Sequence, residues 1–414
     1  MKRTSKARHA PHRTPSAFST LLRLLGIALA VVVVAALGVV GFIAADLAMR
    51  VSEDAVPLED APDVAPPSLG AYPGAFAILL IGTDECGPVS TERLGERCER
   101  EDGVLNDINL LVHVSASPRK VSVVSLPRDL MVAVPECERE DGSTASGMSR
   151  APINTVFAHA GLSCVAKTVT DLSGLRIGFA AKLGFDGVME ITDAIGGVEV
   201  CIGERGLHDE LTGLDWGPGP RTISGYEALQ FIRVRKSIGD GSDLARISNQ
   251  QQYMSRLART VLSSETLTDI PKLLRLASTV ATNVDPSDTL ADPRRLAQLA
   301  LATKDVPFED FVFLQYPTLD DPQDPARVVP NEEAAQPMWD AIGAGRSMEI
   351  TGRASNHGGA VAEEPAPEST PTPTASASPG PAPSPSASAT SDTTVLSPEI
   401  SGIDLNQETC AGSR

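Results

Sequence analysis

Arginine residues recur at short spacings in one segment of the chain, and this spacing predicts an anion site. Arg233 and Arg235 lie two residues apart. We expect them on a strand, where residues two apart point to the same face and present parallel guanidinium groups. A guanidinium fork binds phosphate or pyrophosphate oxygens bidentately, which favours arginine over lysine. The alternative is that these are surface arginines paired with acids, in a chain with 53 Asp and Glu against 35 Lys and Arg.

A helix is predicted shortly after these arginines. The sequence Gly239-Asp240-Gly241 indicates a turn, and Asp243 is expected to be the N-cap of the following helix. Arg246 and Gln250 lie four residues apart, so they share a helix face directed toward the end of the strand. The positive potential of the helix N-terminus also favours an anion. The segment as a whole therefore predicts a phosphate or pyrophosphate site.

Each of three predicted strands has an aspartate beside one end. The apolar runs that predict these strands are Ala75–Ile81, Ile108–Val114 and Lys120–Leu126. Asp84 follows the first run, Asp107 precedes the second, and Arg128 with Asp129 follows the third. Because ligands of open α/β sheets gather beyond strand ends, we expect Asp84, Asp107 and Arg128 to converge with the later arginines.

Asp84 and Asp107 are candidate ligands of a magnesium ion. Mg²⁺ is usually held by one or two carboxylates, with water and substrate phosphate oxygens completing its shell. The alternative is that these acids only occupy the turns that bound strands. Neither His113 nor His159 is expected to be catalytic, because His113 lies in an apolar strand run and His159 on a predicted helix.

The elements that must position these residues lie between positions 74 and 353. There, short apolar runs alternate with helical stretches. This alternation predicts an α/β fold, in which a central mixed sheet is flanked by helices in one domain.

The N-terminal part predicts a membrane anchor. Residues 1–23 are basic and carry no acid, and residues 24–45 form an uncharged run of 22 residues. Such a run matches the thickness of a bilayer, so we expect a single transmembrane helix. The basic flank stays cytoplasmic, which places the following domain outside the cell membrane. A cleaved signal peptide is the alternative.

The segments that flank the domain differ from it in composition. Residues 46–73 are acidic and proline-bearing, and we expect an extracytoplasmic stalk. Residues 354–414 are dominated by Ala, Pro, Ser and Thr, and we expect a disordered tail without a core, or a low-complexity binding arm.

Charge and cysteine content limit the partners and the compartment. The net charge of −18 argues against nucleic acid as a partner. All six cysteines fall in the outward part, where an even number favours disulfides, with Cys86 and Cys98 as the first pair expected. A zinc site is the alternative, although the chain has no C-x-x-C pair.

Taken in order, the motifs over residues 74 to about 262 resemble the LytR-CpsA-Psr family. They are Gly82-Thr83-Asp84, Asn106-Asp107, Ser125-Leu126-Pro127-Arg128-Asp129, Ile153-Asn154, Phe185-Asp186-Gly187 with Ile195-Gly196-Gly197-Val198, and the segment from Arg233 to Gln251. The chain departs from the family pattern at Cys86 and Asn249, where the family often has arginine.

The resemblance implies an enzyme of cell-wall assembly. It would transfer a glycopolymer phosphate from a polyprenyl-pyrophosphate carrier to peptidoglycan. The resemblance assigns pyrophosphate binding to Arg128, Arg233, Arg235 and Arg246, with Asp243 and Gln250 in the same motif, and Mg²⁺ binding to Asp84 and Asp107. The implied partners are the lipid-linked glycopolymer, peptidoglycan and the membrane.

The chemistry of such a transfer leaves several points open. Arginines and magnesium would neutralise phosphate charge while a sugar hydroxyl attacks in line, so positioning supplies most of the rate. Asp129 or Asp243 would accept the hydroxyl proton or, as we favour, orient an arginine. Apolar pairs such as Leu257-Ala258 and Leu273-Leu274 would pack as core or form a groove for the polyprenyl chain.

Two other functions compete with the transferase. A membrane-anchored pyrophosphatase or phosphatase would use water in place of the sugar acceptor. A non-catalytic adaptor would bind wall polymer only, and the departures at Cys86 and Asn249 leave this alternative open.

Overall fold

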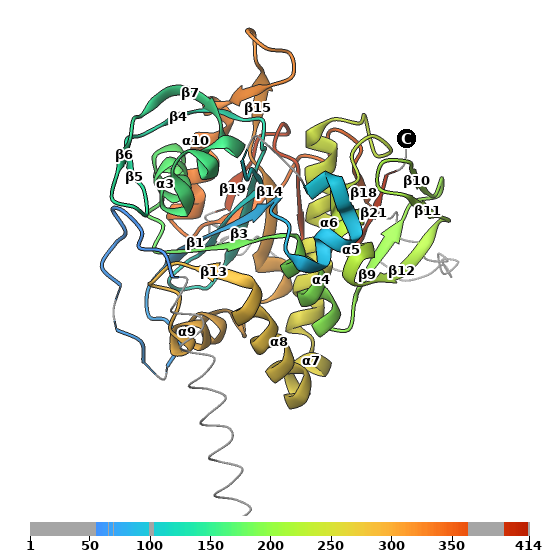
Figure 1. Ribbon diagram of the computed structural model, residues 1–414, viewed down its shortest axis with the longest axis horizontal. Coiled ribbons are helices and arrows are strands. Elements are labelled where there is room, and N and C mark those ends of the chain that lie inside the picture. Colours follow the sequence, from blue (N-terminus) through green and yellow to red (C-terminus); the bar gives the residue numbers. More distant parts are fainter. Residues whose placement is uncertain (1–54, 65, 69, 99–102, 363–392, 413–414) are drawn as a thin grey trace, which may run out of the picture. The chain divides into compact units, whose positions relative to one another are not determined.

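The structure is a computed structural model of the chain (Figure 1). It describes residues 55–64, 66–68, 70–98, 103–362 and 393–412, except for the side chains of residues 270 and 293. The basic segment 1–23 and the transmembrane helix expected at 24–45 lie outside these ranges. Within the described part, no helix is both long and apolar enough to cross a membrane.

The centre of the fold is a mixed seven-stranded sheet. In spatial order its strands are β13 (Val284–Pro286), β8 (Phe179–Leu183), β1 (Phe76–Thr83), β2 (Asn106–Val114), β3 (Val121–Leu126), β14 (Phe311–Gln315) and β20 (Gly402–Asp404). Strand β1 runs parallel to β8, and β3 parallel to β14, whereas β2 is antiparallel to both β1 and β3. The three predicted strands are confirmed as β1, β2 and β3, and the predicted α/β fold with a mixed sheet is confirmed.

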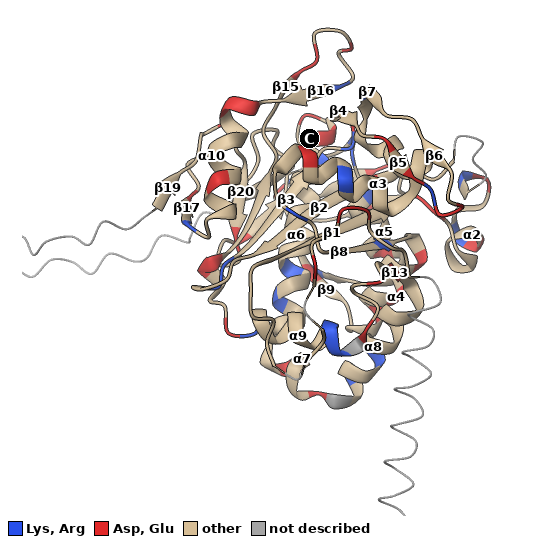
Figure 2. Cartoon of the chain, turned by 90° about the vertical axis from the view of Figure 1, so that its left-hand side faces the viewer, with Lys and Arg blue, Asp and Glu red and all other residues tan. Residues whose placement is uncertain are grey.

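Helices pack on both faces of this sheet. The helices of the described residues are α2 (Pro88–Leu94), α3 (Val156–Ser173), α4 (Phe185–Ala194), α5 (Gly225–Arg233), α6 (Asp243–Leu262), α7 (Ser264–Thr268), α8 (Ile270–Asn283), α9 (Pro293–Thr303) and α10 (Glu332–Gly343), with 3-10 turns η1 (Gly95–Cys98), η2 (Ile153–Thr155) and η3 (Phe308–Asp310). Helices α3 and α10 lie on one side of the sheet, and α8 and α9 on the other (Figure 1; Figure 2).

The remaining strands form small sheets around the centre. A four-stranded sheet has the order β12 (Gly219–Ile223), β9 (Val198–Ile202), β21 (Thr409–Ala411) and β18 (Ala360–Ala362). The two-stranded sheets pair β4 (Met131–Val134) with β7 (Met148–Pro152), β5 (Cys137–Glu138) with β6 (Thr144–Ala145), β10 (Leu207–Asp209) with β11 (Leu214–Trp216), β15 (Thr318–Asp320) with β16 (Val328–Pro330), and β17 (Ser347–Glu349) with β19 (Thr393–Val395).

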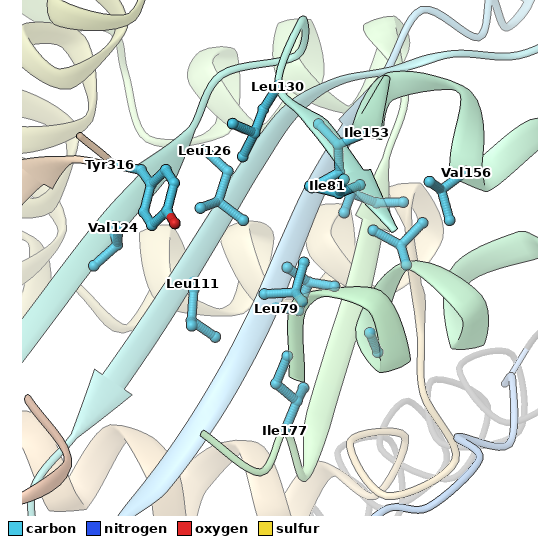
Figure 3. Close-up of a cluster of buried hydrophobic side chains, with 14 of the residues drawn as sticks. Leu79, Ile81, Leu111, Val124, Leu126, Leu130, Ile153, Val156, Ile177 and Tyr316 are labelled. Carbon is cyan, nitrogen blue, oxygen red and sulfur yellow. The ribbon is translucent and has the colours of Figure 1, made fainter. Parts of the chain in front are cut away.

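Alternating apolar side chains give the central sheet two buried faces. Leu79 and Leu111 are fully buried on the face that α3 and α10 cover (Figure 3). Leu110 and Phe313 belong to the core on the other face, together with Leu299 of α9. Because neighbouring strand residues point to opposite faces, one apolar run serves both cores. Burial of a Leu or Phe side chain stabilises the fold by about 1.5–3 kcal/mol, so the strands are held firmly and their ends are fixed in place.

The strand expected at Gln230–Arg235 is wrong. Gln230 to Arg233 form the end of α5, and Arg235 lies in the connection that follows. The buried residues Ala228, Leu229 and Ile232 recur at helical spacing, so the apolar stripe extends upstream of the arginines. The two arginines therefore do not share a strand face.

The helix cap expected at Asp243 is displaced by one residue. Ser242 is the N-cap of α6, and its side chain accepts the N–H of Ala245 at 3.2 Å. Serine is as good a cap as aspartate. Asp243 becomes the first helical residue, and its carboxylate is left to face arginines.

The expectation of a tail without a core is wrong for residues 354–362 and 393–412. Strand β20 pairs with β14, and Ile400, Ile403 and Leu405 are almost completely buried. These apolar residues are few among the Pro, Ala, Ser and Thr residues that dominate the composition of the whole tail. The stretch with the most Pro, Ala, Ser and Thr, residues 363–392, lies outside the described residues. Average composition therefore hid a short segment that completes the central sheet.

The expectation of a free stalk at 46–73 is wrong for its described part. The N–H of Val56 donates to the carbonyl of Pro286 at 3.0 Å. The carboxylate of Glu59 forms an ion pair with Lys167 of α3 at 2.8 Å, and the ring of Tyr72 packs against Phe76. From residue 55 onward, this segment is attached to the domain by hydrogen bonds and ring contacts.

Candidate active site

A cleft of about 530 Å³ lies at the edge of the sheet where β1 and β3 end and β2 begins. Asp84 follows β1, Asp107 lies at the start of β2, and Arg128 follows β3. Because β2 is antiparallel to both neighbours, these three positions meet at one edge. The structure therefore brings together the three residues that the strand-end pattern predicted.

Hydrogen bonds of neighbouring amides fix this edge. The side chain of Asn106 donates to the carbonyl of Ile153 at 3.1 Å, and its oxygen accepts the N–H of Phe157 at 3.1 Å. The N–H of Asn154 donates to the carbonyl of Arg128 at 3.2 Å. These contacts join the start of β2, the η2 turn and the residue that carries a candidate guanidinium.

Arg128 is the centre of an ion-pair network. Its Nη1 donates to both oxygens of Asp107, at 3.2 and 3.1 Å. Its Nε lies 3.3 Å from Asp243 and 3.6 Å from Asp129. Burial opposes its charge, but the pKa of Arg128 is raised because the Asp107, Asp243 and Asp129 carboxylates outweigh that effect. The guanidinium is therefore held charged at the base of the cleft.

Asp243 and Arg246 form a buried pair in the first turn of α6. The Nη2 of Arg246 lies 2.6 Å from Oδ1 of Asp243, and both side chains are 8% exposed. Burial raises the pKa of the Asp243 carboxyl, against the opposing effect of the Arg246 and Arg128 guanidiniums. Among the described residues, Nε and Nη2 of Arg246 form no hydrogen bond of good geometry. Buried N–H groups are normally hydrogen-bonded, and an anion in the cleft would be a suitable acceptor for these two.

Arg233 reaches the same cleft from the end of α5. Its guanidinium lies 4.9 Å from the ring centroid of Phe185, and its Nη1 donates to the side chain of Gln230 at 3.1 Å. Arg235 is half-buried and does not line the cleft among the described residues. It lies near enough to Asp243 and Arg246 to act on the pKa of both groups. The cleft thus gathers Arg128, Arg233 and Arg246, whereas Arg235 does not line it.

The amides of α6 hold the end of α5. The side chain of Asn249 donates to the carbonyl of Phe231 at 3.0 Å, and that of Gln250 donates to the carbonyl of Ile232 at 3.0 Å. Carbonyls at a helix C-terminus lack partners within the helix, so these amides complete them. Gln250 lines the cleft as well, whereas Asn249 is fully buried. Asn249, one of the two departures from the family pattern, therefore helps to hold the end of α5.

An apolar cavity of about 400 Å³ adjoins the cleft. Gly82, Ile108, Leu183, Val188, Ile232 and Gln250 line both spaces. Ile78, Leu80 and Leu110 line the cavity from the sheet, and Met254 and Leu257 line it from α6. Of the two pairs expected to line a lipid groove or the core, Leu257 lines this cavity, whereas Leu274 is 61% exposed.

The oxygen donors of the cleft fit a magnesium ion. Among the described residues, no group of three or more His, Cys, Asp or Glu side chains forms a metal site. Magnesium needs only one or two carboxylates when a phosphate substrate is present. Asp84 and Asp107 supply two carboxylates in one cleft, although Asp107 also holds Arg128 and Asp84 accepts the N–H of Leu105 at 2.8 Å.

Sequence reasoning missed Glu96 and Arg97, which line the cleft from the η1 turn. The disulfide between Cys86 and Cys98, which was the first pair expected, is confirmed and brings this turn beside Asp84. That pairing was the one signal able to find them, because the turn lies in a polar stretch without a strand pattern.

Among the described residues, no histidine and none of the other cysteines lines the cleft. Disulfides join Cys137 to Cys164 and Cys201 to Cys410, which excludes the zinc alternative, since all six cysteines are paired. His113 is buried at the far end of β2, where burial lowers its pKa to about 4. His159 lies on α3, outside the cleft.

The comparisons with known proteins agree with this geometry. The model of the LytR_cpsA_psr family matches residues 48–340. The cell wall biosynthesis protein LcpA of Corynebacterium glutamicum is 31% identical over 52% of this chain and 45% of its own length, so the chain spans about half the length of that relative. TagT of Bacillus subtilis, named a polyisoprenyl-teichoic acid–peptidoglycan teichoic acid transferase, is 24% identical over 56% of this chain and 66% of its own length.

A solved structure shows the same fold. The structure of TagT bound to LIIa-WTA has a TM-score of 0.50 and 19% identity, over 69% of this chain and 97% of that chain. At this identity, the structural likeness is evidence for the fold alone. The family assignment rests on the family model, which matches residues 48–340. The chain therefore belongs to the LytR_cpsA_psr family, the LytR-CpsA-Psr family that its motifs resemble.

Proposed function

We propose that this protein transfers a glycopolymer phosphate from a polyprenyl-pyrophosphate carrier to peptidoglycan. One observation carries the proposal: a cleft with three site arginines adjoins an apolar cavity through six shared lining residues. A lipid-linked pyrophosphate has a charged group next to an apolar chain, which matches a charged cleft next to an apolar cavity. Family membership and the printed names of relatives, which include teichoic acid transferases, support the same class of reaction.

The donor would lie with its pyrophosphate in the cleft and its first isoprene units in the cavity. Arg246 and Arg128 would bind phosphate oxygens at the base of the cleft, and Arg233 would bind from the side of α5. Charge-assisted hydrogen bonds from arginine to phosphate are the strong ones in proteins. The apolar residues would bind the lipid by the hydrophobic effect.

The reaction exchanges the phosphoanhydride bond of the donor for a phosphate ester bond to the acceptor sugar. A sugar hydroxyl of peptidoglycan attacks the phosphorus that carries the glycan, and a P–O bond forms there. The bond from this phosphorus to the bridging oxygen breaks, and polyprenyl phosphate leaves with the electron pair and the hydroxyl proton. The arginines neutralise the charge that develops on the leaving phosphate, and positioning supplies much of the rate.

Magnesium would be held by Asp84 and Asp107 and would supply further positive charge to the phosphate oxygens. Asp129 and Asp243 both lie within ion-pair distance of Arg128. These contacts favour the orienting role over the role of a general base, because the carboxylate oxygens are already engaged in ion pairs with the guanidinium.

The location of the domain is part of the proposal. We propose that the uncharged run at residues 24–45 anchors the chain in the cell membrane, with the domain on the outer side. The three disulfides of the domain support this, since disulfides persist in oxidising compartments.

The test is product analysis with the full chain in detergent, because residues 393–412 belong to the core. The chain is mixed with a short polyprenyl-pyrophosphate glycan, magnesium and a peptidoglycan fragment, and the products are analysed by mass spectrometry. We expect a phosphodiester-linked glycan on the fragment and its loss in Arg128→Ala. Free glycan phosphate without a linked product would identify a pyrophosphatase, and bound but intact donor would identify an adaptor.

A further inference from the structure

The loop between β1 and β2 carries a segment that a disulfide closes onto the site. This tethered segment, residues 87–98, contains α2 and η1, and the Cys86–Cys98 bond joins its two ends. The carboxylate of Asp186 accepts the N–H groups of Val89 and Ser90, at 2.8 and 2.7 Å. The segment is thus attached to α4 at its start and covalently to the end of β1.

Arg97 of the tethered segment lines the cleft and is exposed. Its Nη1 donates to the carbonyl of Leu211, in the turn between β10 and β11, at 2.9 Å. The next residue of that turn, Thr212, accepts a hydrogen bond from the side chain of Gln230, which in turn accepts one from Arg233. One turn therefore holds Arg97 and a site arginine on the same side of the cleft.

We propose that Arg97 is a further substrate-binding residue, which contacts the glycan-side phosphoryl group of the donor at the mouth of the cleft. The proposal rests on the proposed function. The hydrogen bond to Leu211 uses one of the five N–H groups of a guanidinium, so the remaining groups serve an anion. Glu96, beside it in the same wall, accepts hydrogen bonds from sugar hydroxyls but repels a second anion. Together they fit the junction of a phosphate and a sugar.

The Cys86–Cys98 bond is the positioning device for this arginine. Arg97 precedes Cys98 directly, so the bond fixes its backbone at a short distance from Asp84, two residues before Cys86. Helix α2 has only seven residues. A helix this short has little stability of its own, so without the disulfide bond it would not hold the segment in position.

The competing explanation is that Arg97 only braces the turn at Leu211. Arg97→Gln separates the two, because glutamine keeps an N–H donor for the carbonyl and loses the charge. Arg93 supplies a matched control: it lies on α2 in the same tethered segment, its guanidinium is 5.8 Å from the ring centroid of Tyr226, and it does not line the cleft.

The experiment measures steady-state transfer by the full chain in detergent, with a short polyprenyl-pyrophosphate glycan as donor. We expect Arg97→Ala and Arg97→Gln to raise the KM for the donor about tenfold with kcat changed less than about twofold, as for loss of a binding contact. Arg93→Ala should leave both constants unchanged. An unchanged KM in Arg97→Gln, or equal effects of Arg97→Ala and Arg93→Ala, would overturn the proposal.

Binding of inorganic pyrophosphate, measured by calorimetry with magnesium, keeps this proposal separate from the proposed function. If Arg246→Ala abolishes binding and Arg97→Ala weakens it about tenfold, both stand. If only Arg246→Ala acts, Arg97 has no such role and the proposed function remains. If neither variant changes binding, the cleft is not a pyrophosphate site and both fail.

The positioning role has its own measurement. Cys86→Ser with Cys98→Ser should raise the donor KM as much as Arg97→Ala does, and adding Arg97→Ala to this variant should change it little further. Independent, multiplying effects would contradict the positioning role. Thermal unfolding of each variant is the control for folding. We expect the rest of the fold, with its two other disulfides, to be retained.

Discussion

The polar cleft and the apolar cavity are built from the same strands but from different parts of them. Residues beyond the strand ends, such as Asp84 and Arg128, give the cleft its charge. Residues on a face of the sheet, such as Leu80 and Leu110, line the cavity. Of the described residues that line the cavity, only Lys182 is charged, and it is paired with Glu85 and Asp285 at 2.6 and 2.8 Å.

The difference between charged strand ends and apolar strand faces explains how one sheet can bind an amphipathic ligand. Strand faces must be apolar to form a core, while strand ends are free to carry charge because turns are solvated. A ligand with a charged head and a lipid chain therefore fits where an edge meets a face. If this view is right, substitutions in the cleft should act on head-group chemistry, and substitutions in the cavity only on donors with a lipid chain.

The largest effect is expected from Arg246→Ala. It removes a guanidinium that is 8% exposed and leaves the buried Asp243 carboxylate with fewer partners. We expect kcat/KM for transfer to fall about 10²–10³-fold, the usual loss for one donor to transition-state charge. Arg294→Ala, which removes an exposed arginine paired with Asp292, is the control and should change the rate less than about twofold. A small loss for Arg246→Ala would separate the cleft from the chemistry.

The second prediction concerns a buried polar group far from the cleft. His113 is 7% exposed, and burial lowers its pKa to about 4 from the ordinary 6.5. Asp63 and Arg176 line the same small cavity as His113. Between pH 6.5 and about 4, His113 is neutral in the folded state but protonated in the unfolded state. Stability is therefore fully present above pH 6.5 and falls as the pH drops toward 4, by up to about 3 kcal/mol.

Urea unfolding at pH 7.5 and 4.5 checks this prediction. His113→Gln removes the titrating group, so its stability should fall less between the two pH values than that of the parent chain. Carboxylates that are protonated in the same range affect both proteins equally, and the difference isolates His113. Equal losses in the two proteins would show that His113 is not a neutral buried group.

The contrast between strands and arginines explains what the sequence can predict. Strands β1 to β3 were predictable because short apolar runs bounded by polar and turn residues are typical of strands that are buried on both faces. The meeting of Asp84, Asp107 and Arg128 followed from strand order alone. Arg233 and Arg235 were assigned to the wrong element, since a six-residue window containing Phe231, Ile232 and Val234 suits a strand as well as a helix end.

Contacts between distant segments were not predictable. Burial of Ile403 and Leu405 depends on a free edge of β14, and nothing local to the tail indicates that edge. Arg97 donates to the carbonyl of Leu211, which lies in another hairpin 114 residues away. In both cases the determining partner is distant in sequence, so local patterns carry no record of it.

The smallest effect, and the one that tests the cavity alone, is expected from Leu80→Trp. Leu80 lines the cavity and is 37% exposed, so a larger ring can be placed there without displacing the buried core, and it would fill space assigned to the lipid. We expect KM for a polyprenyl donor to rise about tenfold, roughly the contribution of burying one or two methylene groups. Binding of inorganic pyrophosphate should stay unchanged, because the cleft keeps all its charges. Leu319→Trp, an exposed change on β15, is the control for a surface tryptophan. If Leu80→Trp weakened pyrophosphate and the lipid donor equally, the two spaces would form one unit, and the division between a strand end for charge and a strand face for lipid would be wrong.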